Sequence, residues 1–132
     1  MLNRIIIMGR LTKDPELRHT STGTAVASFT LAVERDFKEK SSGQRATDFI
    51  EVVAWRQTGE FAAKHFAKGR MAVVEGRLQL RDFEDRNGNK RRVAEVLAEH
   101  IYFADSKRED GKPDAKSQDF SELSDEDGEL PF

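Results

Sequence analysis

Residues 70–103 read RMAVVEGRLQLRDFEDRNGNKRRVAEVLAEHIYF, and the middle of this stretch is the strongest indication of fold class in the chain. Asn87-Gly88 favours a type I′ turn, because both residues accept the positive φ angles that such a turn requires. Apolar residues before the turn alternate with polar ones, as in a strand that buries one face. The stretch therefore predicts an antiparallel hairpin with strands over 70–84 and 90–103.

Turn sequences also divide the rest of the body into separate segments. They include STGT at 21–24, KSSGQ at 40–44 and Gly69. Three further segments are rich in Ile, Val, Thr and Phe and are expected to be strands: 4–12, 24–35 and 47–56. A helix is expected over 58–69, where Ala62 and Phe66 share one face and Gly69 can serve as the C′ residue.

The predicted order is three strands, one helix and two strands. This order is typical of the OB-fold, an all-β, five-stranded Greek-key barrel with one α-helix between strands 3 and 4. An SH3-like barrel or an α+β sandwich fits the same order, and the fold alone does not select a ligand.

Composition limits the class of protein. The 132 residues include no cysteine, which excludes disulfides and thiolate metal sites. The apolar run Ile5–Met8 is far too short for a signal segment or a membrane span. We expect a cytoplasmic protein of one domain with an appendage.

Charge separates the chain into two parts. Residues 1–103 hold 18 Lys and Arg against 14 Asp and Glu, whereas residues 104–132 hold 4 against 10. The second part also lacks periodicity and large apolar residues, so it cannot bury enough surface to fold. We predict a domain over 1–104, a disordered linker over 105–118 and an acidic interaction tip over 119–132. A basic body favours a polyanionic partner, although a solvated surface explains the asymmetry equally well.

The segment TDFIEVVAWR at 47–56 has two distinct faces. Strand alternation places Ile50, Val52 and Ala54 in the interior and directs Phe49 and Trp55 outward. Exposed aromatic side chains usually mark an interface, which is either a ligand face or a contact with a helix or another subunit.

The segment 70–85 repeats this arrangement. One phase holds Ala72, Val74, Gly76, Leu78 and Leu80, and the other holds Arg77, Gln79, Arg81 and Phe83. Aromatic rings beside arginines suit single-stranded nucleic acid, because bases stack on rings and cations contact phosphates without reading sequence. A protein that reads duplex DNA would instead present base-edge readers to the major groove.

Phe37 is a further candidate ring. Strict alternation places it in phase with Phe29 and Val33, which look like core residues, so a bulge or bend is required for Phe37 to reach the outer face. The predicted phosphate contacts are basic residues on strands or beside turns: Arg4, Arg10, Lys13, Arg35, Arg56, Arg77, Arg81, Arg86 and Arg91.

No catalytic motif is visible. His19, His65 and His100 are far apart and lack the spacing of a metal motif, and the chain has no P-loop or nucleophile elbow. We therefore expect no enzyme activity, no metal and no cofactor.

Three stretches resemble the bacterial single-stranded DNA-binding protein family. They are NRIIIMGRLTKDPELRHTSTGTAVASFTLAVERDF, TDFIEVVAWRQTGEFAAKHFAKGRMAVVEGRL and the terminal DGELPF. The resemblance implies an OB barrel, a homotetramer around which single-stranded DNA wraps, and stacking rings at Phe37, Phe49, Trp55 and Phe83. Three of these four positions are Phe where some relatives carry Trp, and the linker is shorter and more charged than in many relatives.

The acidic end carries an apolar tip. Leu130 and Phe132 are anchors, Pro131 restricts the backbone, and Asp127 and Glu129 can steer the tip towards a basic pocket. The resemblance implies that this tip docks replication, recombination and repair proteins. The alternatives are a specialised paralogue acting in DNA uptake or primosome assembly, an oligosaccharide-binding or tRNA-binding OB module, and a structural protein that oligomerises through its aromatic face.

Overall fold

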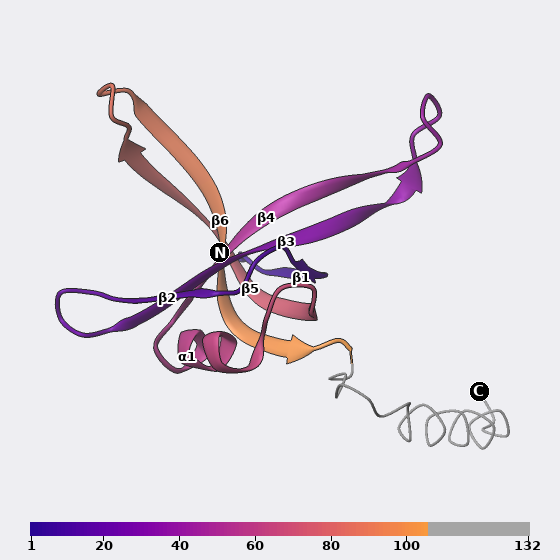
Figure 1. The fold of residues 1–132 in the computed structure, drawn as a ribbon. Coiled ribbons are helices and arrows are strands. Elements are labelled where there is room, and N and C mark those ends of the chain that lie inside the picture. Colours follow the sequence, from indigo (N-terminus) through magenta and orange to yellow (C-terminus); the bar gives the residue numbers. More distant parts are fainter. Residues whose placement is uncertain (106–132) are drawn as a thin grey trace, which may run out of the picture.

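The computed structural model describes residues 1–105, so most of the predicted linker and all of the predicted tip lie outside the described residues. The described chain forms six strands and one helix (Figure 1): β1 Ile5–Leu11, β2 Glu16–His19, β3 Ala25–Lys38, β4 Arg45–Trp55, α1 Arg56–His65, β5 Met71–Glu84 and β6 Lys90–Phe103. Asp105, the first residue of the predicted linker, accepts hydrogen bonds from the Met71 amide at 3.1 Å and from Arg70 Nε at 3.0 Å.

The strands form one sheet in the order β1-β5-β6-β4-β3-β2, and β1 also pairs with β3. That second pairing, Arg10 with Ala32 and Leu11 with Leu31, closes β1, β3, β4, β5 and β6 into a barrel. The all-β OB-fold prediction is confirmed, with α1 between the third and fourth barrel strands. The short strand β2 was not predicted, and it lies on the outer edge of β3.

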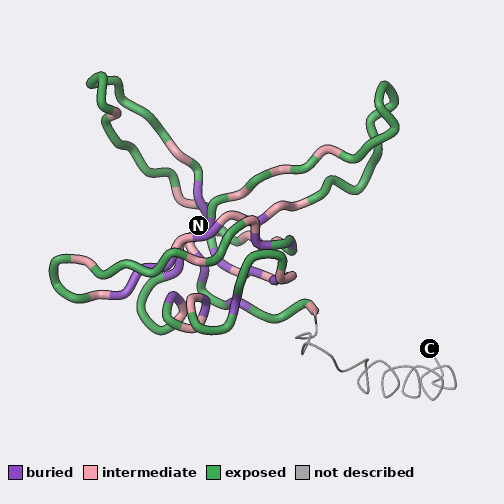
Figure 2. Tube along the Cα trace, in the orientation of Figure 1, coloured by how far each residue is buried: buried purple, intermediate pink, exposed green. Residues whose placement is uncertain are grey.

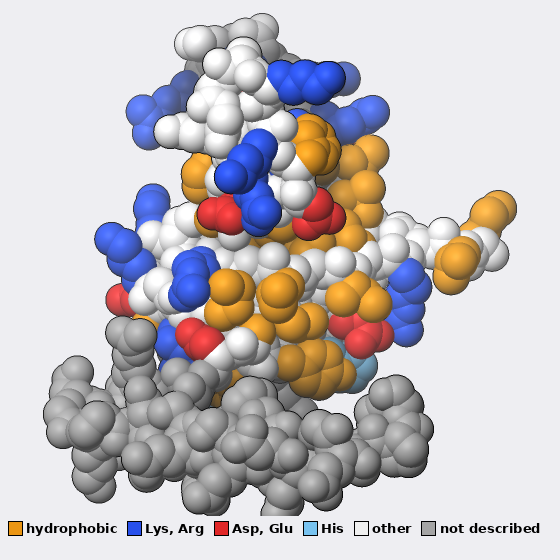
Figure 3. Space-filling model, turned by 90° about the vertical axis from the view of Figure 1, so that its right-hand side faces the viewer, with side chains coloured by type: hydrophobic (Ala, Val, Ile, Leu, Met, Phe, Trp, Pro, Cys, Tyr) orange, Lys and Arg blue, Asp and Glu red, His pale blue; other side chains and the backbone are white. Residues whose placement is uncertain are grey.

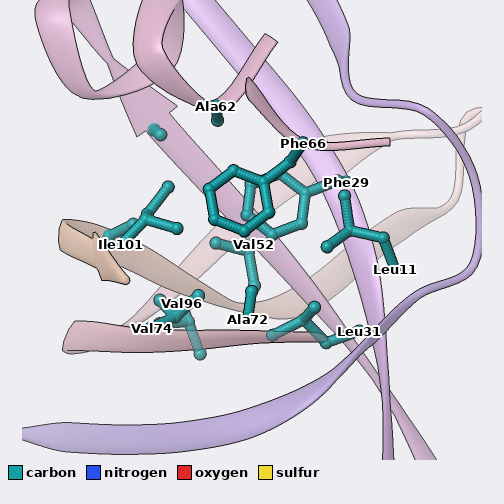
Figure 4. Packing of buried hydrophobic residues seen from close by; sticks show 12 residues of the cluster. Leu11, Phe29, Leu31, Val52, Ala62, Phe66, Ala72, Val74, Val96 and Ile101 are labelled. Atoms are coloured by element: carbon teal, nitrogen blue, oxygen red, sulfur yellow. The ribbon is translucent and has the colours of Figure 1, made fainter. Parts of the chain in front are cut away.

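Small aliphatic side chains fill the barrel (Figure 4). Leu31, Val52 and Val74 are fully buried, and the rings of Phe29 and Phe66 pack in the same cluster. The helix covers one end of the barrel by burying Ala62. It is shorter than predicted, ending at His65. Gly69 is not its C′ residue but belongs to a later turn, with φ +89° and its amide bonded to the Leu11 carbonyl at 2.8 Å.

Two long hairpins, β3–β4 and β5–β6, project beyond the barrel, and we call them the β3–β4 arm and the β5–β6 arm (Figure 1). Their outer halves are mostly exposed in Figure 2. Leu78 and Leu80 share the phase of buried Val74, as predicted, but they are 45% and 57% exposed. Alternation continues along the strand after the barrel interior has ended, so the same phase no longer means burial.

The β5–β6 hairpin is confirmed, but its turn is not type I′. Gly88 has φ +78°, whereas Asn87 has a negative φ. The Gly88 amide donates to the Asp85 carbonyl at 3.0 Å, and the Asp85 carboxylate accepts from the amides of Asn87 at 2.9 Å and Asn89 at 3.0 Å. The aspartate side chain thus organises a longer turn that only one left-handed residue completes.

Candidate nucleic-acid interface

The outward side of the sheet is one continuous surface. Residues that lie opposite each other on neighbouring strands point to the same side. Such a row runs through Glu16, Ser28, Val53, Leu97 and Arg77 on β2, β3, β4, β6 and β5. We call this side the outer face, and it includes the residues that alternation assigned to the exterior of β4 and β5.

Two aromatic rings stand on this face from β4. Phe49 is 67% exposed and Trp55 is 43% exposed, while Val52 and Ala54 between them are 0% exposed. Trp55 lies opposite Val26, and Val26 lies opposite Arg18 on β2, so Trp55 and Arg18 are on the same side of the sheet. The geometry therefore matches the predicted assignment of the two faces of β4.

A groove of about 320 Å³ lies beside β4. Its walls come from β2, β3 and β4, from Lys13 and Asp14 before β2, and from Arg81 and Glu95 of the β5–β6 arm. Glu51 and Val53, which lie between Phe49 and Trp55 along β4, line it as well. The groove thus runs from the part of β4 between the two rings to the β5–β6 arm.

Phe83 extends this surface onto the β5–β6 arm. It is 39% exposed, and the guanidinium carbon of Arg81 lies 5.6 Å from the centre of its ring. Phe83 also lines an open hollow of about 720 Å³ on the arm, together with Lys90, Arg91 and Arg92. A ring bordered by arginines is the combination that the sequence predicted here.

Phe37 lies near the end of the β3–β4 arm and is 64% exposed. The predicted irregularity is present, because the register between β3 and β4 shifts between Glu34 and Lys38. Phe37 does not line the groove described above. The four predicted rings therefore fall into a central pair and one on each arm.

Four of the predicted phosphate-binding arginines already have carboxylate partners. Arg4 pairs with Glu99 and with Glu75 at 3.8 Å, and none of these three residues lines the groove. The other three pairs are Arg35 with Asp48 at 3.0 Å, Arg81 with Glu95 at 3.5 Å and Arg91 with Asp85 at 3.1 Å.

The remaining predicted cations are Arg10, Lys13, Arg56, Arg77 and Arg86, which form no ion pair with any carboxylate within residues 1–105. Arg10 donates to the Gly69 carbonyl at 3.0 Å, and Lys13 lines the groove. Arg56 follows Trp55 directly and has φ +57°, a left-handed conformation that is strained for a side chain of this kind.

The ion pairs shift the titration of their members. The hydrogen bonds that Arg35 donates to Asp48 lower the pKa of the Asp48 carboxyl, and the same interaction raises the pKa of Arg35. The pKa of Asp85 is lowered first by the backbone amide of Asn89 and then by Arg91. These carboxylates stay charged at neutral pH and keep their arginines in place.

Two groove residues are absent from the predicted site. Arg18 lines the groove, and the sequence identified it only as one of several basic residues beside turns. Glu95 was missed because the spacing of a charged residue on a strand does not reveal burial. Both became visible only through the pairing of the strands.

Within the described part of the chain, no cluster of three metal-binding side chains occurs, and the three histidines are exposed. No helix among residues 1–105 is long and apolar enough to cross a membrane. The predicted tip residues Asp127, Glu129, Leu130, Pro131 and Phe132 lie outside the described residues.

The chain is similar to known bacterial proteins. It is 52% identical over 103 residues to single-stranded DNA-binding protein 2 of Listeria innocua, and 50% identical over 111 residues to single-stranded DNA-binding protein A of Bacillus subtilis. These alignments cover 78% and 84% of this chain and 64% of each relative. The chain thus spans just under two thirds of the length of these relatives. Residues 2–104 match the single-strand binding protein family, and the chain belongs to that family.

Proposed function

We propose that the protein binds single-stranded DNA without sequence preference and has no catalytic role. The observation that carries the proposal is the outward projection of Phe49 and Trp55 from a strand that buries Val52 and Ala54 on its other face. The groove beside this strand also presents Lys13, Arg18 and Arg81, among four acidic residues. A single strand offers unpaired bases to the rings and phosphates to the cations. The names of the relatives from Listeria and Bacillus support the same ligand.

The geometry suits several nucleotides in succession. Phe49 and Trp55 are six residues apart on one strand, which is roughly 20 Å at about 3.3 Å per residue. Bases can stack on the two rings while Lys13 and Arg56 neutralise nearby phosphates. Phe83 and Phe37 lengthen the path onto the two arms. Stacking is possible for every base, so this arrangement gives affinity without sequence preference.

The direct test is a titration with oligo(dT) followed by fluorescence. Trp55 is the only tryptophan of the sequence, so the signal reports on this face alone. Stacking is expected to quench the indole, and a duplex of equal length is expected to bind far more weakly at moderate salt. Equal affinity for duplex and single strand would contradict the stacking proposal, and an unchanged signal at saturating oligo(dT) would contradict a base stack on Trp55.

We further propose that the protein assembles as a homotetramer. Met8, Val73 and Tyr102 lie opposite one another on β1, β5 and β6, and Met8 and Tyr102 are 56% and 50% exposed. Hydrophobic side chains also gather over the middle of the face turned to the viewer in Figure 3. A second subunit would remove such a surface from water. Sedimentation equilibrium at micromolar concentration tests this, and a monomer would refute it.

The C-terminal residues complete the proposal. We propose that Leu130, Pro131 and Phe132, with the acids before them, recruit proteins of replication, recombination and repair to DNA that the barrel protects in the cytoplasm. The support is the sequence of the tip, in which an acidic run ends in apolar anchors. Deletion of Phe132 is expected to abolish capture of such partners and to leave oligo(dT) affinity nearly unchanged. Equal capture by the intact and shortened chains would refute a docking role.

A further inference from the structure

Glu95 is the one charged residue that is buried among residues 1–105, with 4% of its surface exposed. It lies on β6 and lines the groove of the outer face. Arg81 of β5 and Glu51 of β4 line the same groove. A carboxylate in this place is unfavourable in two ways, because burial removes its hydration and its charge repels a polyanion. Its contacts indicate what it does there.

The contacts of Glu95 lead towards Phe83. Its Oε1 atom accepts a hydrogen bond from Nε2 of Gln79 at 3.3 Å and lies 3.5 Å from Nε of Arg81. The Arg81 side chain is 53% exposed, so the guanidinium bridges the buried carboxylate and the surface. At the surface, the guanidinium lies 5.6 Å from the centre of the Phe83 ring, which is within the range of a cation–π contact.

We infer that Glu95 is a positioning residue for DNA binding: it holds the Arg81 guanidinium against Phe83, so that this ring is oriented before DNA arrives. The inference rests on the proposed function and deepens it. A ring fixed in advance loses less entropy when a base stacks on it. Arg81 is then not a phosphate contact, because its departure would leave a buried carboxylate unpaired.

A matched pair of substitutions separates positioning from simple charge. Glu51 lines the same groove but is exposed and forms no ion pair within residues 1–105, so Glu51→Gln removes one negative charge without disturbing an arginine. If Glu95 acts only as a negative charge, Glu95→Gln and Glu51→Gln will both tighten oligo(dT) binding. If it positions Arg81, Glu95→Gln will instead weaken binding, by roughly fivefold for a lost cation–π arrangement. Glu95→Gln affinity equal to or tighter than that of the intact protein overturns the inference.

A double-mutant cycle provides the second readout. Phe83→Leu is expected to cost less affinity in the Glu95→Gln protein than in the unmodified protein, because the ring is no longer oriented there. The same substitution is expected to cost its full amount in the Glu51→Gln protein. Additive effects in both backgrounds overturn the inference.

Arg81→Lys keeps the inference testable if Glu95→Gln fails to fold. Lysine keeps the charge but lacks the planar group that can meet a carboxylate and a ring together. We expect roughly fivefold weaker binding of oligo(dT) with an unchanged dependence on salt. Full affinity in Arg81→Lys would overturn the positioning role. Absence of binding by the unmodified protein would refute the proposed function itself, so the two failures are distinguishable.

Discussion

Phe49→Leu tests whether the exposed rings of β4 act in binding and not in folding. The ring is 67% exposed, so only about a third of its surface contacts the protein, and leucine keeps most of that contact. We therefore expect the free energy of unfolding to change by less than about 0.5 kcal/mol, as for an ordinary surface substitution. The lost stack is worth about 1–3 kcal/mol, so the Kd for oligo(dT) should rise roughly 5-fold to 150-fold.

The assay is the quenching of Trp55 by oligo(dT) at several salt concentrations, with urea unfolding of the free protein beside it. The slope of log affinity against log salt should stay unchanged, because no phosphate contact is removed. Val52→Ala is the control, because Val52 is 0% exposed on the opposite face of the same strand. It should lower the free energy of unfolding by about 2 kcal/mol through two buried methyl groups and the cavity they leave. Unchanged affinity in Phe49→Leu, or a large loss of its stability, would refute the assignment of faces.

Three further predictions follow from single residues. Arg56→Gly relieves a left-handed φ of +57° but adds flexibility to the unfolded chain, so stability should change by less than about 1 kcal/mol. Its oligo(dT) binding should weaken with a salt slope smaller by about 0.7, and an unchanged slope would show that Arg56 contacts no phosphate. Gly76→Ala should destabilise the barrel by about 3 kcal/mol or more in urea, because its Cβ would lie only 1.9 Å from a backbone carbonyl oxygen of β6. The turn around Asp85 should be complete above the ordinary carboxyl value of 3.8 and should loosen as pH falls through the lowered pKa of the folded state. The amide NMR shift of Asn89 should report this change with a midpoint below 3.8, and a midpoint at or above that value would contradict the hydrogen bonds assigned here.

The faces of the barrel strands could be predicted because alternation is a property of a strand wherever it lies. Val52 and Trp55 were assigned correctly for this reason. Leu78 and Leu80 show the limit of the same argument, since phase gives the side of the sheet but not the point at which the interior ends. That point depends on which strands close the barrel, and the sequence of one strand does not contain this information.

Other features depend on pairing between distant segments. Strand β2 has only four residues, all exposed, so it has no hydrophobic pattern to detect. The partners of the arginines are also unpredictable from spacing, because Arg35 and Asp48, or Arg81 and Glu95, meet only after two strands have paired in one register. A list of basic residues therefore overestimates the cations that are free to bind phosphate.

The four rings stand on segments that differ in local stability. Phe49 and Trp55 stand on β4, whose other face packs in the core through Val52 and Ala54, so opening this strand requires opening the barrel. Phe37 and Phe83 stand on arms that have few buried side chains, and such segments open at a lower free energy than the core. Ion pairs add contacts on these arms: Arg35 with Asp48 on the β3–β4 arm, and Arg81 with Glu95, Arg91 with Asp85 and Arg92 with Asp82 on the β5–β6 arm. The central pair is thus fixed by the fold, whereas Phe83 is held by its local contact with Arg81. This difference makes the β5–β6 arm the place where charge substitutions should alter DNA binding without altering the barrel.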